Sequence, residues 1–344
     1  MQIKEALSYD DILLVPQYSD IVSRSEVDLG SNLGEYNRFE LPIVSSPMDT
    51  ITETEMAGVM NSAGGLAIIH RYNSIETQAQ LVQNSLNING DRCAAAVGIT
   101  GDYFERSQEL VRSGAKILCL DVAHGHHSLM RNALHALRKK VGLDIHLMAG
   151  NVATLEGFAD LATWGANSVR VGIGGGSICS TRTQTGHGLP TLESIVAAKI
   201  TKAHGKFSDV AIIADGGIKN SGDIVKALAC GADLVMIGSL LAGTDECPGE
   251  IIATSEGKFK TYRGMASKDA QLAWRGKATS LEGISTAVPY RGSAYAVLKD
   301  LERGIKSGLS YSGARSIKEL QEKVRFVIQS SAGQFESSTH ILKR

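Results

Sequence analysis

Residues Ser113–Asp121 read SGAKILCLD, and the same order of glycine followed by an apolar run recurs twice further along the chain. The recurrences are Trp164–Gly172 (WGANSVRVG) and Cys230–Ser239 (CGADLVMIGS). In each copy, a glycine of the kind that ends a helix precedes a short run rich in valine, isoleucine or leucine. Nearly unbroken runs of this kind suit strands that are buried on both faces of a parallel sheet. The repeated unit therefore predicts a helix that is followed by a buried parallel strand.

Similar apolar runs alternate with segments of helical periodicity through the first two thirds of the chain. The runs are Leu41–Ser46, Gly65–His70, Ala94–Gly98, Lys116–Asp121, Asp144–Gly150, Ser168–Gly172, Asp209–Asp215 and Asp233–Ser239. The helical segments are Thr52–Ser62, Ser74–Leu86, Tyr103–Ser113, His127–Lys140, Leu155–Trp164, Thr191–His204 and Ser221–Cys230. This alternation predicts an α/β protein with a (β/α)8 TIM barrel, and an open doubly wound sheet is the competing architecture.

The composition narrows the class of protein. The chain has 344 residues and a net charge of −1, which argues against an electrostatic nucleic-acid binder or a membrane-surface protein. No apolar run approaches the ~20 residues that span a bilayer, and the first ten residues, MQIKEALSYD, lack a signal core. The five cysteines lie far apart with no CxxC spacing. We expect one catalytic domain over residues 1–344, in the cytoplasm, without nucleic-acid or membrane partners.

Glycines follow the last two predicted strands of the barrel. Asp215-Gly216-Gly217 ends the seventh run and Gly238-Ser239 ends the eighth. Loops after strands seven and eight often hold phosphate in barrel enzymes, because glycine lets backbone amides approach the oxygens. Either turn alone is more simply explained as a tight turn. Their occurrence on consecutive strand ends favours a phosphate site, with Asp215 placed to accept bonds from ribose hydroxyls.

The loop after the sixth run is the most unusual stretch of the chain. Residues 172–182 read GIGGGSICSTR, with four glycines in five positions followed by Cys179. Glycine carbonyls can face a monovalent cation, and we predict a possible potassium site formed by the backbone of Gly174, Gly176 and Cys179. A cysteine on such a loop is a candidate nucleophile, although a free cysteine is more often a small buried residue. We interpret the other four cysteines as structural.

Polar residues also follow the fourth run, where residues 121–127 read DVAHGHH. Three histidines suggest a metal site, but no suitable carboxylate partners are evident, so a polar rim is the favoured interpretation. Asp121 at the strand end can still bind a cofactor or substrate.

With these motifs assembled, the chain resembles the IMP dehydrogenase/GMP reductase family almost from end to end. The matching motifs are LSYDDILLVPQYSDI (Leu7–Ile21), SSPMDTITE (Ser45–Glu53), GGLAIIHR (Gly64–Arg71), GNVAT (Gly150–Thr154), GIGGGSICSTR (Gly172–Arg182), ADGGIKNSGDI (Ala214–Ile224), MIGSLLAGTDECPGE (Met236–Glu250) and YRGM (Tyr262–Met265). The resemblance implies a barrel, usually a homotetramer, that binds a purine 5′-monophosphate (GMP or IMP) beside a nicotinamide cofactor.

The resemblance also implies roles for individual residues. Cys179 matches the thiolate that attacks C2 of the purine, and Thr181 with Glu282 matches a pair that handles protons. The implied substrate-binding residues are Ser46, Met48, Ser177, Asp215, Gly216, Gly217, Gly238, Ser239, Tyr262, Gly264 and Met265. The implied cofactor-side residues are Asp121, Val122, Ala123 and Asn151.

Two activities remain open within the family. Its dehydrogenases oxidise IMP with NAD, and most carry a regulatory insert where this chain has only residues 87–92. Their flap carries an Arg-Tyr pair that activates water, whereas residues 266–281, ASKDAQLAWRGKATSL, contain Arg275 and no tyrosine. This pattern favours a GMP reductase that uses NADPH.

Other motifs favour the alternative, an IMP dehydrogenase. PMDTITE, GGLAIIHR and YRGM are more typical of dehydrogenases, and Glu282-Gly283-Ile284 departs from the Glu-Gly-Lys of reductases. We further predict a mobile flap at about residues 266–285. The tail Gly333–His340 lies where family members contact a neighbouring subunit, so a cation site is also predicted there.

Overall fold

Eight parallel strands close into a barrel in the computed structural model, which describes residues 3–34, 38–89, 92–142, 144–203, 205–279 and 281–337. The strands are β4 (Ile43–Ser45), β5 (Leu66–Ile69), β6 (Ala94–Val97), β7 (Ile117–Asp121), β8 (His146–Val152), β9 (Ser168–Val171), β10 (Ala211–Asp215) and β11 (Leu234–Ile237). Each pairs with the next in chain order, and β11 pairs with β4 through Met236 and Val44. The predicted (β/α)8 barrel is confirmed, and the open sheet is excluded.

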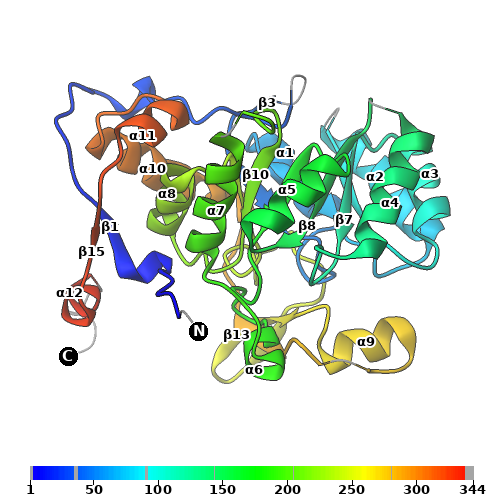
Figure 1. Cartoon of the computed structure of the whole chain (residues 1–344). Coiled ribbons are helices and arrows are strands. Elements are labelled where there is room, and N and C mark those ends of the chain that lie inside the picture. Colours follow the sequence, from blue (N-terminus) through cyan, green and yellow to red (C-terminus); the bar gives the residue numbers. More distant parts are fainter. Residues whose placement is uncertain are drawn as a thin grey trace.

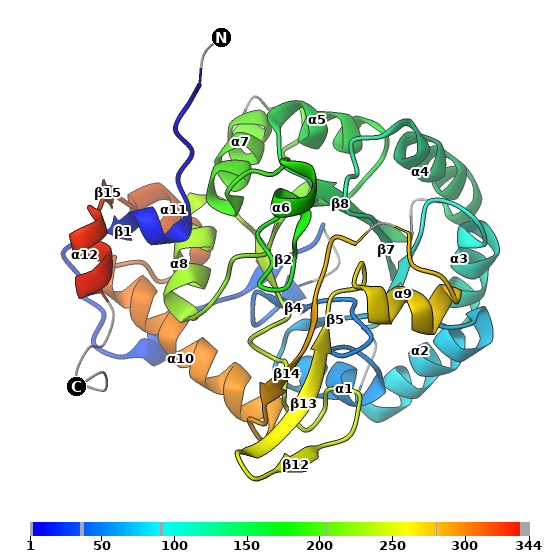
Figure 2. The ribbon, with the colours of Figure 1, turned by 90° about the horizontal axis from the view of Figure 1, so that it is seen from below.

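Helices surround the barrel, as the periodicity predicted (Figure 2). They are α1 (Thr54–Ser62), α2 (Ile75–Asn89), α3 (Tyr103–Arg112), α4 (Ser128–Val141), α5 (Leu155–Thr163), α7 (Thr191–Ala203), α8 (Ser221–Cys230) and α10 (Ala294–Tyr311). Each of the seven predicted helices is present within a few residues of its expected bounds. His204, the expected end of the sixth, lies outside the described residues.

The barrel interior is filled by side chains and closed at one end. Residues from seven of the eight strands, all except β9, form an inner cluster with Leu33 and Phe39, both fully buried. Phe39 belongs to β3 (Arg38–Phe39), which pairs with β2 (Ser31–Asn32) before the first barrel strand. This hairpin therefore plugs the amino-terminal end of the barrel, and the carboxyl ends of the strands remain available for a site.

A three-stranded antiparallel sheet and a short helix extend from the carboxyl end of the barrel (Figure 1). The sheet comprises β12 (Ile252–Thr254), β13 (Gly257–Arg263) and β14 (Ser285–Pro289), and α9 (Lys268–Arg275) lies between the last two strands. Ser267 caps α9 by accepting from the Ala270 amide, and Gly276, with φ of 67°, ends it. The predicted flap therefore contains a helix, which the serine cap and the glycine stop define. Flap mobility stays a prediction.

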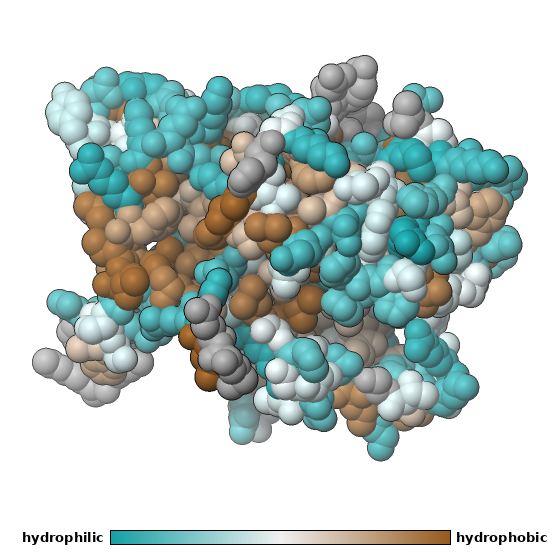
Figure 3. All heavy atoms as spheres, viewed as in Figure 1, coloured by the Kyte–Doolittle hydropathy of each residue, from teal (hydrophilic) through white to brown (hydrophobic). Residues whose placement is uncertain are grey.

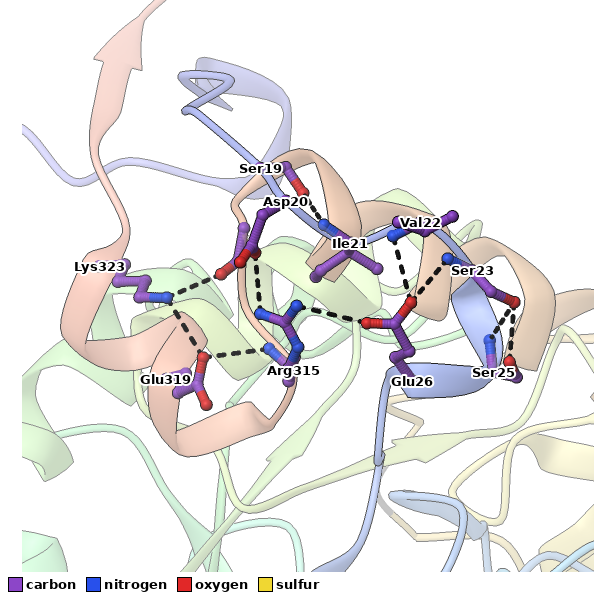
Figure 4. Close-up of polar contacts among 11 residues, drawn as sticks. Ser19, Asp20, Ile21, Val22, Ser23, Ser25, Glu26, Arg315, Glu319 and Lys323 are labelled. Atoms are coloured by element: carbon purple, nitrogen blue, oxygen red, sulfur yellow. Dashed lines mark hydrogen bonds and ion pairs between the residues drawn. The ribbon is translucent and has the colours of Figure 1, made fainter.

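A strand near the start of the chain pairs with a strand near its end, beside the barrel. β1 (Ile12–Leu14) pairs with β15 (Phe326–Ile328), which follows α11 (Ile317–Lys323) and precedes α12 (Ser331–Glu336). Figure 4 shows Arg315 bonded to Asp20 at 2.9 Å and to Glu26 at 3.3 Å. These ion pairs fasten the amino-terminal segment to the carboxyl-terminal helices. Among the helices that the structure describes, none combines the length and apolarity needed to cross a membrane.

Candidate active site

A cleft of about 690 Å³ opens at the carboxyl ends of the barrel strands. Its size falls in the range of small-molecule sites. Every residue that the sequence analysis assigned to catalysis, substrate, cofactor or the potassium site in the cysteine loop lines it: Ser46, Met48, Asp121, Val122, Ala123, Asn151, Gly174, Gly176, Ser177, Cys179, Thr181, Asp215, Gly216, Gly217, Gly238, Ser239, Tyr262, Gly264, Met265 and Glu282. The barrel thus brings together segments that lie more than 200 residues apart in sequence.

Cys179 differs from the other cysteines in its exposure to solvent. Its thiol lies 3.2 Å from the Thr181 hydroxyl, which donates to Glu282 Oε2 at 2.8 Å. The other four cysteines are buried, and burial raises the pKa of the Cys93 thiol to about 12 and that of Cys119 to about 11. The thiolate is the reactive form of cysteine. The exposed thiol with its two polar neighbours is therefore the nucleophile candidate of the chain.

Backbone hydrogen bonds bring Glu282 to this loop from far along the chain. The Ser180 amide donates to the Glu282 carbonyl at 3.0 Å, and the Glu282 amide donates to Ala266 at 3.2 Å. Ile284 donates to the carbonyl of Ile178 at 3.1 Å. The end of the flap is therefore laid along the cysteine loop, and the Glu282 carboxylate meets Thr181.

The glycines of two loops are in contact with one another. A Cβ on Gly172, which has φ of 133°, would lie 2.1 Å from the Asp215 carbonyl, and a Cβ on Gly216 would lie 3.0 Å from the Gly176 amide nitrogen. Any side chain at these positions would force the two loops apart. This close approach gathers backbone amides at the strand ends, which suits binding of a phosphate.

A second close approach occurs at Gly238, after β11. A Cβ there would lie 3.2 Å from the Tyr262 hydroxyl and 3.3 Å from that of Ser46. The Ser177 and Tyr262 hydroxyls are 3.5 Å apart. Burial raises the pKa of Tyr262, so its phenol stays protonated and can donate a hydrogen bond. These hydroxyls face the same small space as the two glycine loops and add donors for an anion.

A buried arginine joins the two carboxylates of the cleft. Arg170, on β9, is 6% exposed and donates to Asp121 at 2.6 Å and to Asp215 at 2.8 Å. Asn151 also donates to Asp215, at 2.7 Å. Burial opposes the guanidinium charge, but Cys119, Asp215 and Asp121 outweigh burial and hold the pKa of Arg170 well above its usual value. The sequence analysis missed this residue, although a charged side chain in a predicted buried strand already demands a partner.

The cofactor side of the cleft contains buried polar atoms that lack hydrogen bonds within the described parts of the chain. They are Asn151 Oδ1, Arg71 Nε and Arg170 Nε, and all three residues line the cleft. Buried polar groups without partners are rare in native proteins and often mark a ligand site. Arg71 and Arg170 both contact Asp121, on the side of the cleft that the family resemblance assigns to the cofactor.

The flap forms a further wall that the sequence analysis did not assign to the site. Gln271, Trp274, Arg275 and Thr279 line the cleft from α9 and the loop after it, and Tyr72 lines it from the end of β5. No local pattern marks these residues, because their proximity depends on how the flap folds back over the barrel.

Two of the three histidines after β7, His126 and His127, have hydrogen-bond partners in the structure. His126 lies 2.8 Å from Asp160, and His127 caps α4 by accepting from the Leu129 amide at 3.0 Å. Burial lowers the pKa of His124, with His126 and His127 adding to the effect. Two of the three histidine side chains therefore make polar contacts with neighbouring elements.

The predicted potassium site remains a prediction. The Gly176 carbonyl already accepts from the Cys179 amide at 3.1 Å and has a second lone pair available. Part of the tail predicted to contribute, residues 338–340, lies outside the described residues.

Comparison with known proteins agrees with the geometry of the site. Residues 6–340 match the model of the IMP dehydrogenase / GMP reductase domain. The chain is 34% identical to an inosine-5′-monophosphate dehydrogenase of Nitrosopumilus maritimus, with 99% of each chain covered. It is 30% identical to a GMP reductase of Leishmania major, covering 99% of this chain and 98% of that one.

A solved structure shares the fold over almost the whole length. A GMP reductase variant from Trypanosoma brucei, in complex with guanosine 5′-monophosphate, superimposes with a TM-score of 0.92 at 29% identity and 98% coverage of both chains. The eight-stranded barrel, the cysteine loop at its carboxyl end and the end-to-end match all lead to one assignment: this chain belongs to the IMP dehydrogenase/GMP reductase family of oxidoreductases.

Proposed function

We propose that this protein is a GMP reductase, which converts GMP to IMP and ammonia with NADPH through a covalent adduct on Cys179. The composition of the flap carries this proposal over its alternative. Residues 266–281 contain one arginine and no tyrosine, and that arginine, Arg275, lies over the Trp274 ring at 4.4 Å. A chain without the family's Arg-Tyr pair is poorly equipped to hydrolyse the adduct, whereas reduction requires no activated water.

The first half of the reaction exchanges sulfur for nitrogen at C2. The bond between Cys179 Sγ and C2 forms as the thiol proton passes through Thr181 to Glu282. The bond from C2 to the exocyclic amino group then breaks, and its nitrogen takes that proton back from Glu282 and leaves as ammonia. Adduct and ammonia together account for every atom of GMP and the thiol. The 3.2 Å and 2.8 Å contacts along this path support the assignment.

In the second half, C2 would receive a hydride from a dinucleotide held beside Asp121 and Asn151. The bond from C2 to Cys179 Sγ breaks, and the thiolate takes a proton from solvent, so one NADPH and one proton are consumed per GMP. The donors and acceptors around Asp121 and Asn151 support dinucleotide binding on this side, together with Val122 and Ala123. Whether NADPH or NADH is preferred follows from the assay below.

We assign the purine nucleotide to the opposite side of the cleft. Its ribose would bind Asp215, and its base would lie along Ser46, Met48, Gly264 and Met265. Its phosphate would lie in the cradle formed by Ser177, Gly216, Gly217, Gly238, Ser239 and Tyr262.

The second candidate is an IMP dehydrogenase, favoured by sequence identity. A dehydrogenase of Borreliella burgdorferi is 36% identical over 98% of this chain, against 30% for the Leishmania major reductase. The lack of an insert does not separate the two activities. The alignment with the reductase extends over 486 positions and that with the Nitrosopumilus maritimus dehydrogenase over 478, against 344 residues here. Longer chains therefore occur under both names.

A spectrophotometric assay separates the candidates. Purified protein is mixed with GMP and NADPH, or with GMP and NADH, and the absorbance of the reduced cofactor is followed. Loss of absorbance with release of ammonia and IMP is expected. Formation of NADH from IMP and NAD, with no reaction of GMP, would refute the reductase and establish the dehydrogenase. Repeating the assay in potassium and in sodium buffers tests the proposed potassium site.

We also propose a homotetramer in the reducing cytoplasm. An apolar strip on β1 and β15 supports association with further copies of the chain: Leu13 is 38%, Phe326 40%, Val327 46% and Ile328 70% exposed. Figure 3 shows apolar side chains gathered on this side of the molecule. Light scattering in solution should give four times the monomer mass, and a monomer would contradict the proposal. Fractionation of cells tests the compartment, which the five unpaired cysteines favour.

A further inference from the structure

The flap contacts the barrel through an aromatic pair and an arginine. Trp274, on α9, meets the Tyr72 ring edge to face with centroids 5.1 Å apart. The Arg71 guanidinium lies 4.9 Å from the Tyr72 ring and 5.5 Å from the Trp274 ring. Arginine next to aromatic rings at these distances is attracted by their quadrupoles. Figure 2 shows α9 in front of one side of the barrel, beside α2 and α3.

The other side of Arg71 meets the carboxylate on the cofactor side of the cleft. Arg71 Nη2 donates to the Asp121 carbonyl at 3.2 Å, and its Nε lies 3.9 Å from Asp121 Oδ2. Arg170 binds the other carboxylate oxygen, Oδ1, at 2.6 Å. Both Arg71 and Asp121 have side chains that are only 15% exposed. The position of Arg71 therefore determines which bonds Asp121 can still offer to a ligand.

Other bonds lie within the flap itself. Its neck is closed by the bond from the Glu282 amide to Ala266, and Gln271 bonds within the flap to Ala266 at 3.0 Å and Thr279 at 3.0 Å. Leu272 on the same helix is 44% exposed. Trp274 thus provides a side-chain contact between the flap and the end of β5.

We propose that Trp274 is a positioning residue, which closes the flap onto Arg71 and fixes that guanidinium against Asp121 for dinucleotide binding. The inference rests on the proposed function, because it assigns Asp121 to the cofactor side. With α9 in this position, Arg71 lies against both rings and needs no reordering when the dinucleotide binds. Since coupling between two equilibria is reciprocal, a bound dinucleotide also holds the flap closed.

The test uses Trp274 itself as a reporter. The chain has two tryptophans, so Trp164→Phe leaves Trp274 as the single source of indole emission. In this background, NADPH is titrated without GMP and its Kd is measured. Tyr72→Ala, measured by Trp274 emission, should raise the Kd for NADPH about 5- to 10-fold. Trp274→Ala lacks the emitting residue, so it is measured by calorimetry, and it should raise the Kd by the same factor. This factor corresponds to the free energy of a partly desolvated cation–π contact. Trp274→Phe should restore it to within about twofold, because phenylalanine keeps an aromatic face.

Two further measurements separate positioning from damage to the fold. The Kd for GMP should not change in Trp274→Ala, and turnover should show a raised KM for NADPH with kcat nearly unchanged. Leu272→Ala is the matched control, since it shortens an exposed side chain on the same helix and should leave both constants unchanged. Tyr72→Ala should also shift the Trp274 emission to the red in the ligand-free protein.

Different results would contradict the positioning role and the proposed function. NADPH affinity in Trp274→Ala equal to that of Leu272→Ala, or no emission shift on removing Tyr72, would overturn the positioning role and leave the proposed function intact. A wild-type chain that bound neither NADPH nor NADH would refute the proposed function itself, and the positioning role with it.

Discussion

Replacing Arg170 with methionine removes a cation that bonds both Asp121 and Asp215. The side chain is 6% exposed, and its two bonds measure 2.6 Å and 2.8 Å, so two carboxylates would lose their shared partner at the base of the cleft. Removing one partner of a buried ion pair costs about 3–5 kcal/mol. Arg71 still lies near Asp121 and Asn151 still bonds Asp215, so the lower end applies here.

We therefore expect Arg170→Met to lower the free energy of unfolding by about 3 kcal/mol, or about a hundredfold in the unfolding equilibrium. Arg170→Lys keeps the charge but replaces the two guanidinium nitrogens that bond Asp121 and Asp215 with a single nitrogen on a shorter side chain, and should cost less than Arg170→Met, about 1–2 kcal/mol. Urea unfolding, followed by circular dichroism at fixed protein concentration, measures both variants.

A double-variant cycle checks the physical cause. Asp121→Asn removes one of the carboxylates that Arg170 bonds, so Arg170→Met should cost less in that background, by about 1–3 kcal/mol. The reasoning would be refuted if Arg170→Met cost under about 1 kcal/mol with an unchanged m-value. Strict additivity with Asp121→Asn would also refute it, because independent sites add.

The remaining predictions concern the chemistry and the pH dependence. Cys179→Ala should lower kcat more than about 1,000-fold while GMP still binds in calorimetry, and residual turnover near the wild-type rate would exclude the covalent step. Glu282→Gln should lower kcat by about 100- to 10,000-fold, because the amide cannot take the thiol proton, and an unchanged rate would remove Glu282 from the proton path. Gly216→Ala places a side chain at φ of 93°, so it should weaken GMP binding and cost about 1–3 kcal/mol of stability, measured by calorimetry and urea unfolding. Burial lowers the pKa of His146 to about 4 from an ordinary 6.5, so the unfolded chain binds the extra proton first and stability falls as pH drops between those values, by up to about 3 kcal/mol. His146→Gln should flatten that dependence in urea midpoints compared at several pH values, and an equally steep curve would contradict the assignment.

Local signals in the chain were sufficient to predict the barrel. Each strand is a short buried run, and each surrounding helix has its own periodicity and end signals, so neither depends on distant residues. The repeated glycine before Lys116, Asn167 and Asp233 lies in front of β7, β9 and β11. Backbone requirements also explain why the glycine loops were found, because Gly172 and Gly216 lie where a Cβ would clash.

The flap shows where local reasoning fails. Residues 266–285 are polar and weakly patterned, yet they include α9, whose cap at Ser267 and stop at Gly276 are local signals that the analysis passed over. The contact of Trp274 with Tyr72 has no local signature, since it joins positions about 200 residues apart.

The sequence by itself determined the closed barrel, the family and the cysteine, glycine and carboxylate residues at the strand ends that line the cleft, because period, glycine position and motif order are all readable along one chain. Only the tertiary structure decided that Arg170 joins Asp121 and Asp215, that Glu282 meets Thr181, and that Arg71 lies near both Trp274 and Asp121. The physical reason is that side-chain pairing across a barrel depends on strand register and on the path of the flap. Both are set by packing over the whole molecule and leave no periodic trace in the chain.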